Sequence, residues 1–239
     1  MLGMRRTLIT LLLLTPAVAL AQVGHDPQTS PYRDLTRGAW LVPQAVFFQG
    51  SGGQLGIAPH GARLFGARAE IGGNRAISFG LEFATGTAER LIVDADGPVA
   101  TRVTGPVDQK LTLAGINLML NLTGGKTWRG IAPYVGGGAG VNFAARTPAD
   151  TSGFNYGRRF YFAPTVGVRF FLTRDLYLRA EARAQFVQLQ YPESYREEPA
   201  SDPGTGGSSN AVLPNGRLKD WNTSGLYTLS IGVPFPWPF

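Results

Sequence analysis

Cysteine is absent from the 239-residue chain, and charged residues are scarce. The absence of cysteine excludes a disulfide framework, a thiolate metal site and cysteine catalysis. Asp, Glu, Lys and Arg make up 16% of the residues, against roughly 25% in ordinary soluble domains. No apolar run after residue 22 is long enough to cross a bilayer as a helix. These shortages disfavour a soluble helical enzyme, a coiled coil and a polytopic helical membrane protein.

Histidine is also rare, whereas the chain contains 32 glycines. The formal net charge of +6 is dispersed without a basic block that interleaves aromatics, so no nucleic acid partner is expected. His25 and His60 lie outside the predicted strands and away from a serine and a carboxylate, which weakens an acyl-transfer site. Asp94 and Asp96 are interpreted as turn residues, because two carboxylates alone do not make a calcium loop. The sequence predicts no catalytic residue, no metal site and no cofactor.

The N-terminus has the organisation of a secretory signal peptide. Two arginines precede an apolar run over 8–14, and Ala19-Leu20-Ala21 matches an A-x-A cleavage site. The apolar run is short for a spanning helix, which argues against an uncleaved anchor. We therefore expect residues 1–21 to be removed by cleavage between Ala21 and Gln22.

Alternation of apolar with small or polar residues dominates the remaining chain. Residues 77–85 read ISFGLEFAT, with apolar side chains at the odd positions. A period of two places chemically different faces on the two sides of a β-strand. Eight strands are predicted in this way, at 39–48, 65–71, 77–85, 114–122, 135–143, 160–170, 176–186 and 227–239. The chain is therefore predicted to be all-β.

The connections between these strands alternate between short and long. Short turns are predicted at 72–75, 123–130 and 173–175, and long loops at 49–62, 144–157 and 192–220. One end of the structure should therefore carry short turns and the other long loops. Residues 91–93 and 99–103 flank a turn and should extend their strands as a hairpin. The loop over 192–220 is rich in Pro, Gly and Ser and is predicted to be mobile.

Alternation alone leaves open which face lies inside. In a lipocalin-like soluble barrel the apolar face lines a cavity, whereas in an outer-membrane barrel it contacts lipid. A water-facing exterior would be rich in lysine, but Lys110, Lys126 and Lys219 are the only lysines and all lie near strand ends or in loops. The polar faces are crowded with Gly, Ala, Ser and Asn, which fit the narrow lumen of an eight-stranded barrel. The bulky apolar faces are therefore predicted to contact lipid.

Taken in order, these features resemble the small outer-membrane β-barrel proteins of Gram-negative bacteria, the group of the OmpA barrel domain, OmpX and OmpW. The likeness rests on the A-x-A signal, the eight alternating segments, PYVGGGAGV at 133–141, VGVR at 166–169 and the terminal Phe239. It implies an eight-stranded antiparallel up-and-down transmembrane β-barrel over 39–239, with short periplasmic turns and long extracellular loops. Residues 22–38 would form a periplasmic N-terminal segment, and Phe239 would belong to the C-terminal signal that the assembly machinery of this family reads.

The chain departs from the family pattern in two respects. Full OmpA-type proteins carry a peptidoglycan-binding domain after the barrel, and none is expected here. Pro234, Pro236 and Pro238 interrupt the last strand, and because successive N–H groups point to opposite neighbours, they remove donors toward one neighbour only. The tail should either pair on one side or leave the sheet as polyproline-like chain. Pro164 lies within a closed barrel, where we expect a bulge or a local irregularity.

Seven charged residues are predicted to point into the lumen under the lipid-facing assignment. They are Arg68, Glu70, Glu82, Arg169, Arg179, Glu181 and Arg183. In a narrow lumen these charges would be costly if unpaired, and they can pair across it as well as along neighbouring strands. The interpretation is a structural ion-pair network that blocks the lumen. A gated path for a solute or ion and a catalytic carboxylate are the alternatives.

The predicted function is non-enzymatic, namely envelope structure, surface interaction or limited solute passage in the outer membrane of a Gram-negative bacterium. A lipid-modifying enzyme barrel, which would need a nucleophile and a base near the outer rim, and a soluble lipocalin-like carrier are the alternatives. The expected partners are outer-membrane lipid and lipopolysaccharide, with the barrel assembly machinery and periplasmic chaperones during biogenesis. The protein is expected to be a monomer.

Overall fold

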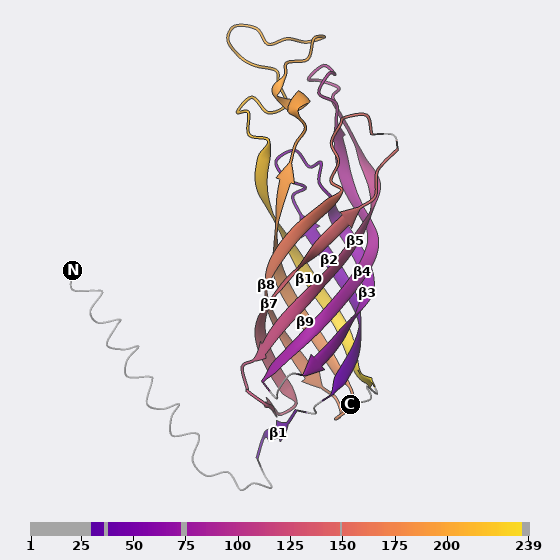
Figure 1. Cartoon of the computed structure of the whole chain (residues 1–239), viewed down its shortest axis with the longest axis vertical. Helices are drawn as coiled ribbons and strands as arrows, with labels where there is room; N and C mark the ends of the chain where they lie inside the picture. The colour runs from indigo at the N-terminus through magenta and orange to yellow at the C-terminus, as the bar shows by residue number, and fades with distance from the viewer. Residues whose placement is uncertain (1–29, 36–37, 73–75, 149, 236–239) are drawn as a thin grey trace, which may run out of the picture.

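Eight long antiparallel strands form a closed barrel in the computed structural model, which describes residues 30–35, 38–72, 76–148 and 150–235 (Figure 1). The strands are β2 (Ala39–Gly50), β3 (His60–Gly72), β4 (Ile77–Val93), β5 (Val103–Asn121), β7 (Ile131–Ala144), β8 (Arg158–Phe171), β9 (Tyr177–Gln190) and β10 (Lys219–Phe235). Each pairs with the next along the chain, and β10 pairs with β2 to close the ring. The predicted eight-stranded antiparallel barrel is confirmed.

Parts of the predicted chain lie outside the described residues. These are the signal peptide over 1–21, its cleavage site between Ala21 and Gln22, His25, and the terminal Phe239. In the part of the chain that the structure describes, no helix is long and apolar enough to cross a membrane.

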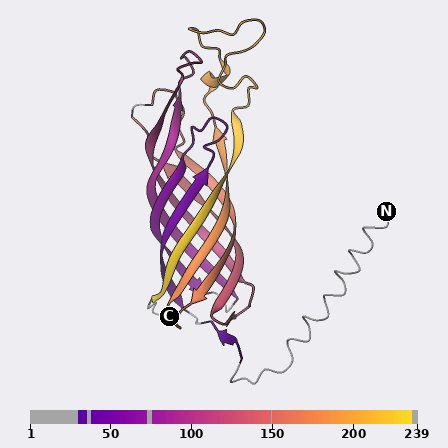
Figure 2. The ribbon, with the colours of Figure 1, turned by 180° about the vertical axis from the view of Figure 1, so that it is seen from behind.

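The two ends of the barrel differ in the way that the connection lengths predict. The long loops and the extended β4–β5 hairpin gather at one end, and the short turns lie at the other, as the view from behind also shows (Figure 2). Two short strands that were not predicted lie at the short-turn end. They are β1 (Tyr32–Asp34) and β6 (Lys126–Trp128), which pair with each other. The N-terminal segment is thus attached to the turn over 123–130.

Large apolar side chains cover the outside of the barrel. On β4, Phe79, Leu81 and Phe83 are 53–65% exposed, whereas the alternate residues Ser78 and Glu82 are buried. The same alternation runs along the other long strands, so that an apolar exterior encloses a polar interior. This arrangement suits a barrel surrounded by hydrocarbon and is the reverse of a water-soluble carrier. The prediction that the apolar faces lie outside is confirmed.

The strands are longer than the alternation predicts, chiefly at the long-loop end. β4 and β5 continue as a hairpin to the pair Val93 and Val103, beyond the predicted ends of their alternating runs. The predicted hairpin is therefore confirmed, but its second strand begins at Val103, since residues 99–102 belong to the turn.

The prolines disturb the sheet only locally. At Pro164 the register between β8 and β9 is the same on both sides, but the described ladder has no pairs at 163 and 164. This is the predicted irregularity, and it is not a bulge, because no extra residue is inserted. Pro234 and Phe235 pair with β2 but not with β9, so the described part of the tail pairs on one side. Pro236 and Pro238 lie outside the described residues.

The loop over 192–220, which is predicted to be mobile, contacts the rest of the molecule at several points. It contains a short 3-10 helix, η2 (Glu193–Arg196), and its Tyr195 is fully buried and donates a hydrogen bond of 2.9 Å to the carbonyl of Val93. Val212 and Leu213 are buried in the same hydrophobic cluster, which also receives Ile57 from the first long loop. The loop is mostly polar, so its composition gives no sign of these few anchoring residues. They pack the long loops together over the end of the barrel, and we call this packed region the loop cap.

Candidate functional site

The structure brings all seven predicted lumen residues together inside the barrel. Their side chains are at most 7% exposed. They come from β3, β4, β8 and β9, and in the ring of eight strands β3 lies opposite β8 and β4 opposite β9. Alternation turns them all to the same side of the sheet, and closure of the sheet then makes distant strands face each other across the lumen.

Arg68 occupies the centre of this lumen network. Its guanidinium lies 2.8 Å from the carboxylate of Glu82, its direct neighbour on β4, and 2.9 Å from that of Glu181 on β9. A second guanidinium nitrogen donates to the other oxygen of Glu181 at 3.1 Å. One arginine therefore links two carboxylates that belong to opposite sides of the barrel, and the contact with Glu181 has the paired geometry that suits a guanidinium.

Glu82 and Arg183 connect β4 with the strand directly opposite. Both terminal nitrogens of Arg183 donate to the Glu82 carboxylate, one of them at 2.7 Å. The Nε of Arg183 also contacts Glu181, two residues away on the same strand face. The upper part of the network is thus a cycle in which two arginines and two glutamates alternate, and each carboxylate has two cationic partners.

Glu70 forms the lower part of the network. Arg169 and Arg179 face each other directly across the β8–β9 ladder, which would be destabilising for two like charges without a counterion. Glu70 supplies that counterion, because its carboxylate contacts Arg179 and lies 3.3 Å from Arg169. Arg179 also donates through Nε to the hydroxyl of Ser230 at 2.9 Å. A single glutamate from β3 therefore neutralises part of a cationic pair on the far wall.

Three tyrosines complete the lumen network and were not among the predicted site residues. Tyr134 donates to Glu181 at 2.5 Å, Tyr161 to Glu82 at 3.2 Å, and Tyr177 to Glu70 at 2.9 Å. Each glutamate thus accepts one phenolic hydrogen bond in addition to its arginine contacts. These hydroxyls satisfy lone pairs that buried carboxylates would otherwise leave unpaired.

Glycines make room for these tyrosine rings. Tyr134 lies directly opposite Gly167, and Tyr177 directly opposite Gly232. A Cβ added at Gly167 would lie 2.4 Å from the ring of Tyr134, and one at Gly232 would lie 2.1 Å from the ring of Tyr177. The signal that could have identified the tyrosines is therefore a cross-strand one: an inward tyrosine next to an inward glycine on the neighbouring strand.

The network carries an excess of positive charge, since four arginines face three glutamates. Arg169 compensates by stacking, with its guanidinium carbon 5.1 Å from the ring centre of Tyr134 and 5.6 Å from that of Tyr177. It also donates to the hydroxyl of Ser78 at 3.1 Å and to Asn121 at 3.3 Å. Aromatic rings and neutral polar groups therefore stabilise the guanidinium that has no glutamate of its own. Side chains from opposite walls of the barrel contact each other across the lumen.

The structure offers no metal centre among its described residues, in which no three His, Asp or Glu side chains lie together in a suitable cluster. Asp94 accepts a hydrogen bond from the backbone N–H of Asp96 at 3.1 Å, as expected for a turn. His60 lies at the start of β3, where Nδ1 is 3.0 Å from the carbonyl oxygen of Ala58.

Comparison with known proteins finds similarity among solved structures. No protein-family model and no curated protein matches the chain. The outer membrane protein OprG of Pseudomonas aeruginosa is 12% identical and has a TM-score of 0.49, with 85% of this chain and 99% of that chain covered. Neisserial surface protein A is 14% identical with a TM-score of 0.45, covering 86% of this chain and 98% of that chain. The N-terminal β-barrel domain of P. aeruginosa OprF is 12% identical with a TM-score of 0.45, covering 84% and 100%.

Proposed function

We propose that the protein is a non-enzymatic barrel of the Gram-negative outer membrane whose lumen is closed, and that it acts through its extracellular loop surface. The observation that carries the proposal is the burial of seven charged side chains in ion pairs that span the lumen. A conducting path would need a continuous column of water beside these groups. Ion pairs that cross the lumen leave little room for such a column.

The packing of the long loops supports a role at the surface. Residues of the long loops over 49–62, 144–157 and 192–220 and of the β4–β5 turn share one hydrophobic cluster, to which Ile57, Phe154, Tyr195 and Ala95 belong. Loops that bury their own apolar side chains present a defined outer surface, unlike loops that only connect strands. Such a surface suits recognition of another molecule outside the cell.

The rim of the barrel supports lipopolysaccharide as a lipid partner. Arg63, Thr87 and Lys110 are cross-strand neighbours on β3, β4 and β5, and Arg63 and Lys110 are both exposed. Phe65, two residues below Arg63 on the same face, belongs to the apolar exterior and is 65% exposed. Cations placed just above an apolar band can contact the phosphate groups of lipopolysaccharide while the band contacts acyl chains.

Cell fractionation tests the location and the fold together. The full chain, expressed with its own N-terminus in a Gram-negative host, should be recovered in outer membranes, start at Gln22, and resist extraction with carbonate or urea. Unboiled protein should migrate differently from boiled protein on a gel, because a closed barrel resists unfolding by detergent. Recovery of the folded chain in the soluble periplasm would overturn the proposal.

A further inference from the structure

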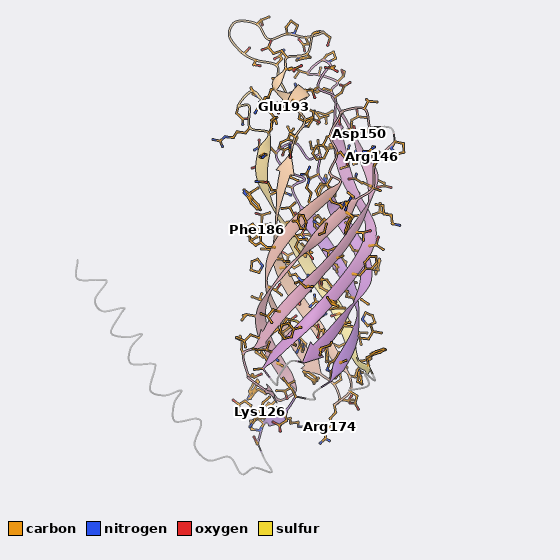
Figure 3. All side chains as sticks on the ribbon, in the orientation of Figure 1. Lys126, Arg146, Asp150, Arg174, Phe186 and Glu193 are labelled. Carbon is orange, nitrogen blue, oxygen red and sulfur yellow. The ribbon has the colours of Figure 1, made fainter. Side chains whose placement is uncertain are left out.

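A separate polar cavity of about 390 Å³ lies at the long-loop end, between the β4–β5 hairpin and the loop that joins β7 to β8. Its lining includes Arg90 and Gln109 from the hairpin and Arg146, Thr147, Asp150 and Phe154 from the loop. Figure 3 labels Arg146 and Asp150 on this loop, beside the hairpin. The volume is within the range of small-molecule sites in proteins.

The cavity contains a buried cation. Arg90 is 1% exposed, its guanidinium pairs with the carboxylate of Asp150, and its guanidinium carbon lies 5.6 Å from the ring centre of Phe154. The Nε of Arg90 has no hydrogen-bond partner. A buried donor without an acceptor is costly, and a ligand oxygen would remove that cost.

Two neutral polar groups that line the same cavity have no hydrogen-bond partner. Gln109 is 5% exposed, and its amide nitrogen donates to the carbonyl of Ala145 at 2.5 Å, which leaves Oε1 buried without a partner. The hydroxyl of Thr147 is also buried without a partner. A ligand that fits the cavity should therefore carry hydrogen-bond donors in addition to an anionic oxygen.

The charge balance decides which kind of donor fits. Arg90 and Arg146 face the cavity with only Asp150 as an anion, so the three side chains carry a formal charge of +1. One carboxylate would neutralise this excess, whereas an ammonium group would be repelled by both arginines. Hydroxyl groups can donate to Gln109 and Thr147 without adding charge.

We propose that this cavity binds a small hydroxycarboxylate of monosaccharide size, such as a sugar acid. The carboxylate lies between Arg90 and Arg146, and the hydroxyl groups donate to Oε1 of Gln109 and to the hydroxyl of Thr147. Arg146 is exposed at the mouth of the cavity, where it can meet the ligand from outside. This site is independent of the lumen network.

Three probes separate charge from hydroxyl groups. The full chain, refolded in detergent micelles, is titrated with D-glucuronate, with D-glucose, which keeps hydroxyls but lacks the charge, and with acetate, which carries the charge alone. Amide NMR spectra should show saturable shifts at Gln109 and in residues 145–157 with glucuronate. Glucose and acetate should bind at least about tenfold more weakly, corresponding to roughly 1.4 kcal/mol.

Single substitutions then assign the contacts. Gln109→Leu should lower the affinity for glucuronate about tenfold and leave acetate binding unchanged, whereas Arg146→Ala should weaken both anions. Arg217→Ala, an exposed arginine outside the cavity lining, is the matched control and should bind as the unsubstituted chain does. The proposal is overturned by the absence of saturable glucuronate shifts, by equal binding of acetate, or by an Arg217→Ala loss as large as that of Arg146→Ala.

Discussion

At the scale of single residues, the lumen is stabilised by contacts most of which join residues of different strands. Arg68 contacts Glu82 on its neighbour and Glu181 across the barrel, and both carboxylates also receive a tyrosine hydroxyl. Buried pairs of this kind gain little over apolar residues when intact, but the loss of one partner leaves a desolvated charge. The residues should therefore be sensitive to single substitution and more tolerant of paired substitution.

The pair Glu82 and Arg183 allows this to be measured. Glu82→Gln should lower the free energy of unfolding by about 3–5 kcal/mol, because Arg183 then loses its bidentate partner in a buried site. Adding Arg183→Met should recover part of the loss. A double-mutant cycle by urea unfolding in lipid vesicles gives the coupling energy.

The exposed pair of Glu193 and Arg196 supplies the control for that cycle. Their side chains are 76% and 50% exposed, so Glu193→Gln should change the stability by roughly 0–1 kcal/mol. A cost for Glu82→Gln no larger than that for Glu193→Gln would contradict the buried network.

Tyr156 gives the loop cap a pH dependence at the alkaline end. Burial raises the pKa of Tyr156 to about 12, although Asn142 donates a hydrogen bond to its hydroxyl. The folded state therefore keeps the phenol neutral above pH 10, where the unfolded chain releases its proton. Stability from this group is complete below about pH 10 and is lost progressively between about pH 10 and pH 12.

We expect the unsubstituted protein to lose roughly 2–3 kcal/mol of unfolding free energy over that interval through Tyr156. Burial also raises the pKa of Tyr191 and Tyr195 in the same loops, so Tyr156→Phe should make the decline shallower without abolishing it. Urea unfolding in detergent at several pH values between 9 and 12 measures the difference. Identical profiles for the two proteins would show that the hydroxyl of Tyr156 is not shielded in this way.

At the scale of strands and loops, the sequence predicts the centre of each strand better than its ends. Leu81 and Leu118 lie in alternating runs that only a two-faced strand explains, so the strands around them were found. The extension of β4 to Val93 was less visible, because above the bilayer both faces of the hairpin meet water or loop residues and the alternation weakens. The anchoring of Tyr195 depends on a carbonyl far away along the chain, and no local pattern encodes it.

For the candidate site, the sequence predicts which charged residues belong to it but not which of them pair. Once the apolar faces are assigned to lipid, alternation requires the charged residues on the polar strand faces to point inward together, so the membership of Arg68 and Glu181 follows from the sequence. Their partners depend on the register and on which strands lie opposite each other, which closure determines. Tyr134 was missed because tyrosine suits either face of a membrane strand, and only the opposite Gly167 shows that it points inward.

Substitution on the outer strand faces tests the assignment of inside and outside. Leu81 is 65% exposed and lies in the middle of an apolar row. Leu81→Arg should destabilise the barrel in lipid vesicles by roughly 2–4 kcal/mol, because a guanidinium near the bilayer centre is poorly solvated. Leu118→Arg should behave similarly.

Ser208→Arg places the same charge in an exposed loop and should be almost silent. Refolding titrations with urea in the same vesicles compare these variants directly. If Leu81→Arg and Ser208→Arg unfolded at the same urea concentration, the outer face of the barrel would not be in contact with hydrocarbon.

At the scale of the whole molecule, three layers of packed side chains lie one above another along the barrel axis. The lumen network crosses the middle, a hydrophobic cluster of packed loops covers the long-loop end, and Trp40, Phe171 and Tyr177 pack together toward the short-turn end. Ring centres of Trp40 and Tyr177 are 5.0 Å apart, and Tyr177 also bonds to Glu70, so the aromatic layer and the network share a residue. In the closed barrel that we propose, a solute would have to displace all three layers to pass through.

Conductance in planar bilayers therefore distinguishes a closed barrel from a pore. The unsubstituted protein should show small or no conductance, because paired charges and rings fill the lumen from wall to wall. Replacing both Glu82 and Arg183 by alanine removes a connection between opposite strands and creates space in the lumen. Because neither member of that pair then remains as an unpaired charge, the barrel should still fold, and conductance should rise. Replacing Glu193 and Arg196 in the same way, outside the lumen, should leave it unchanged. Large, stable, ohmic channels in the unsubstituted protein that are indifferent to the Glu82 and Arg183 substitutions would mean that solute flow bypasses the network, and a pore function would then replace the closed one.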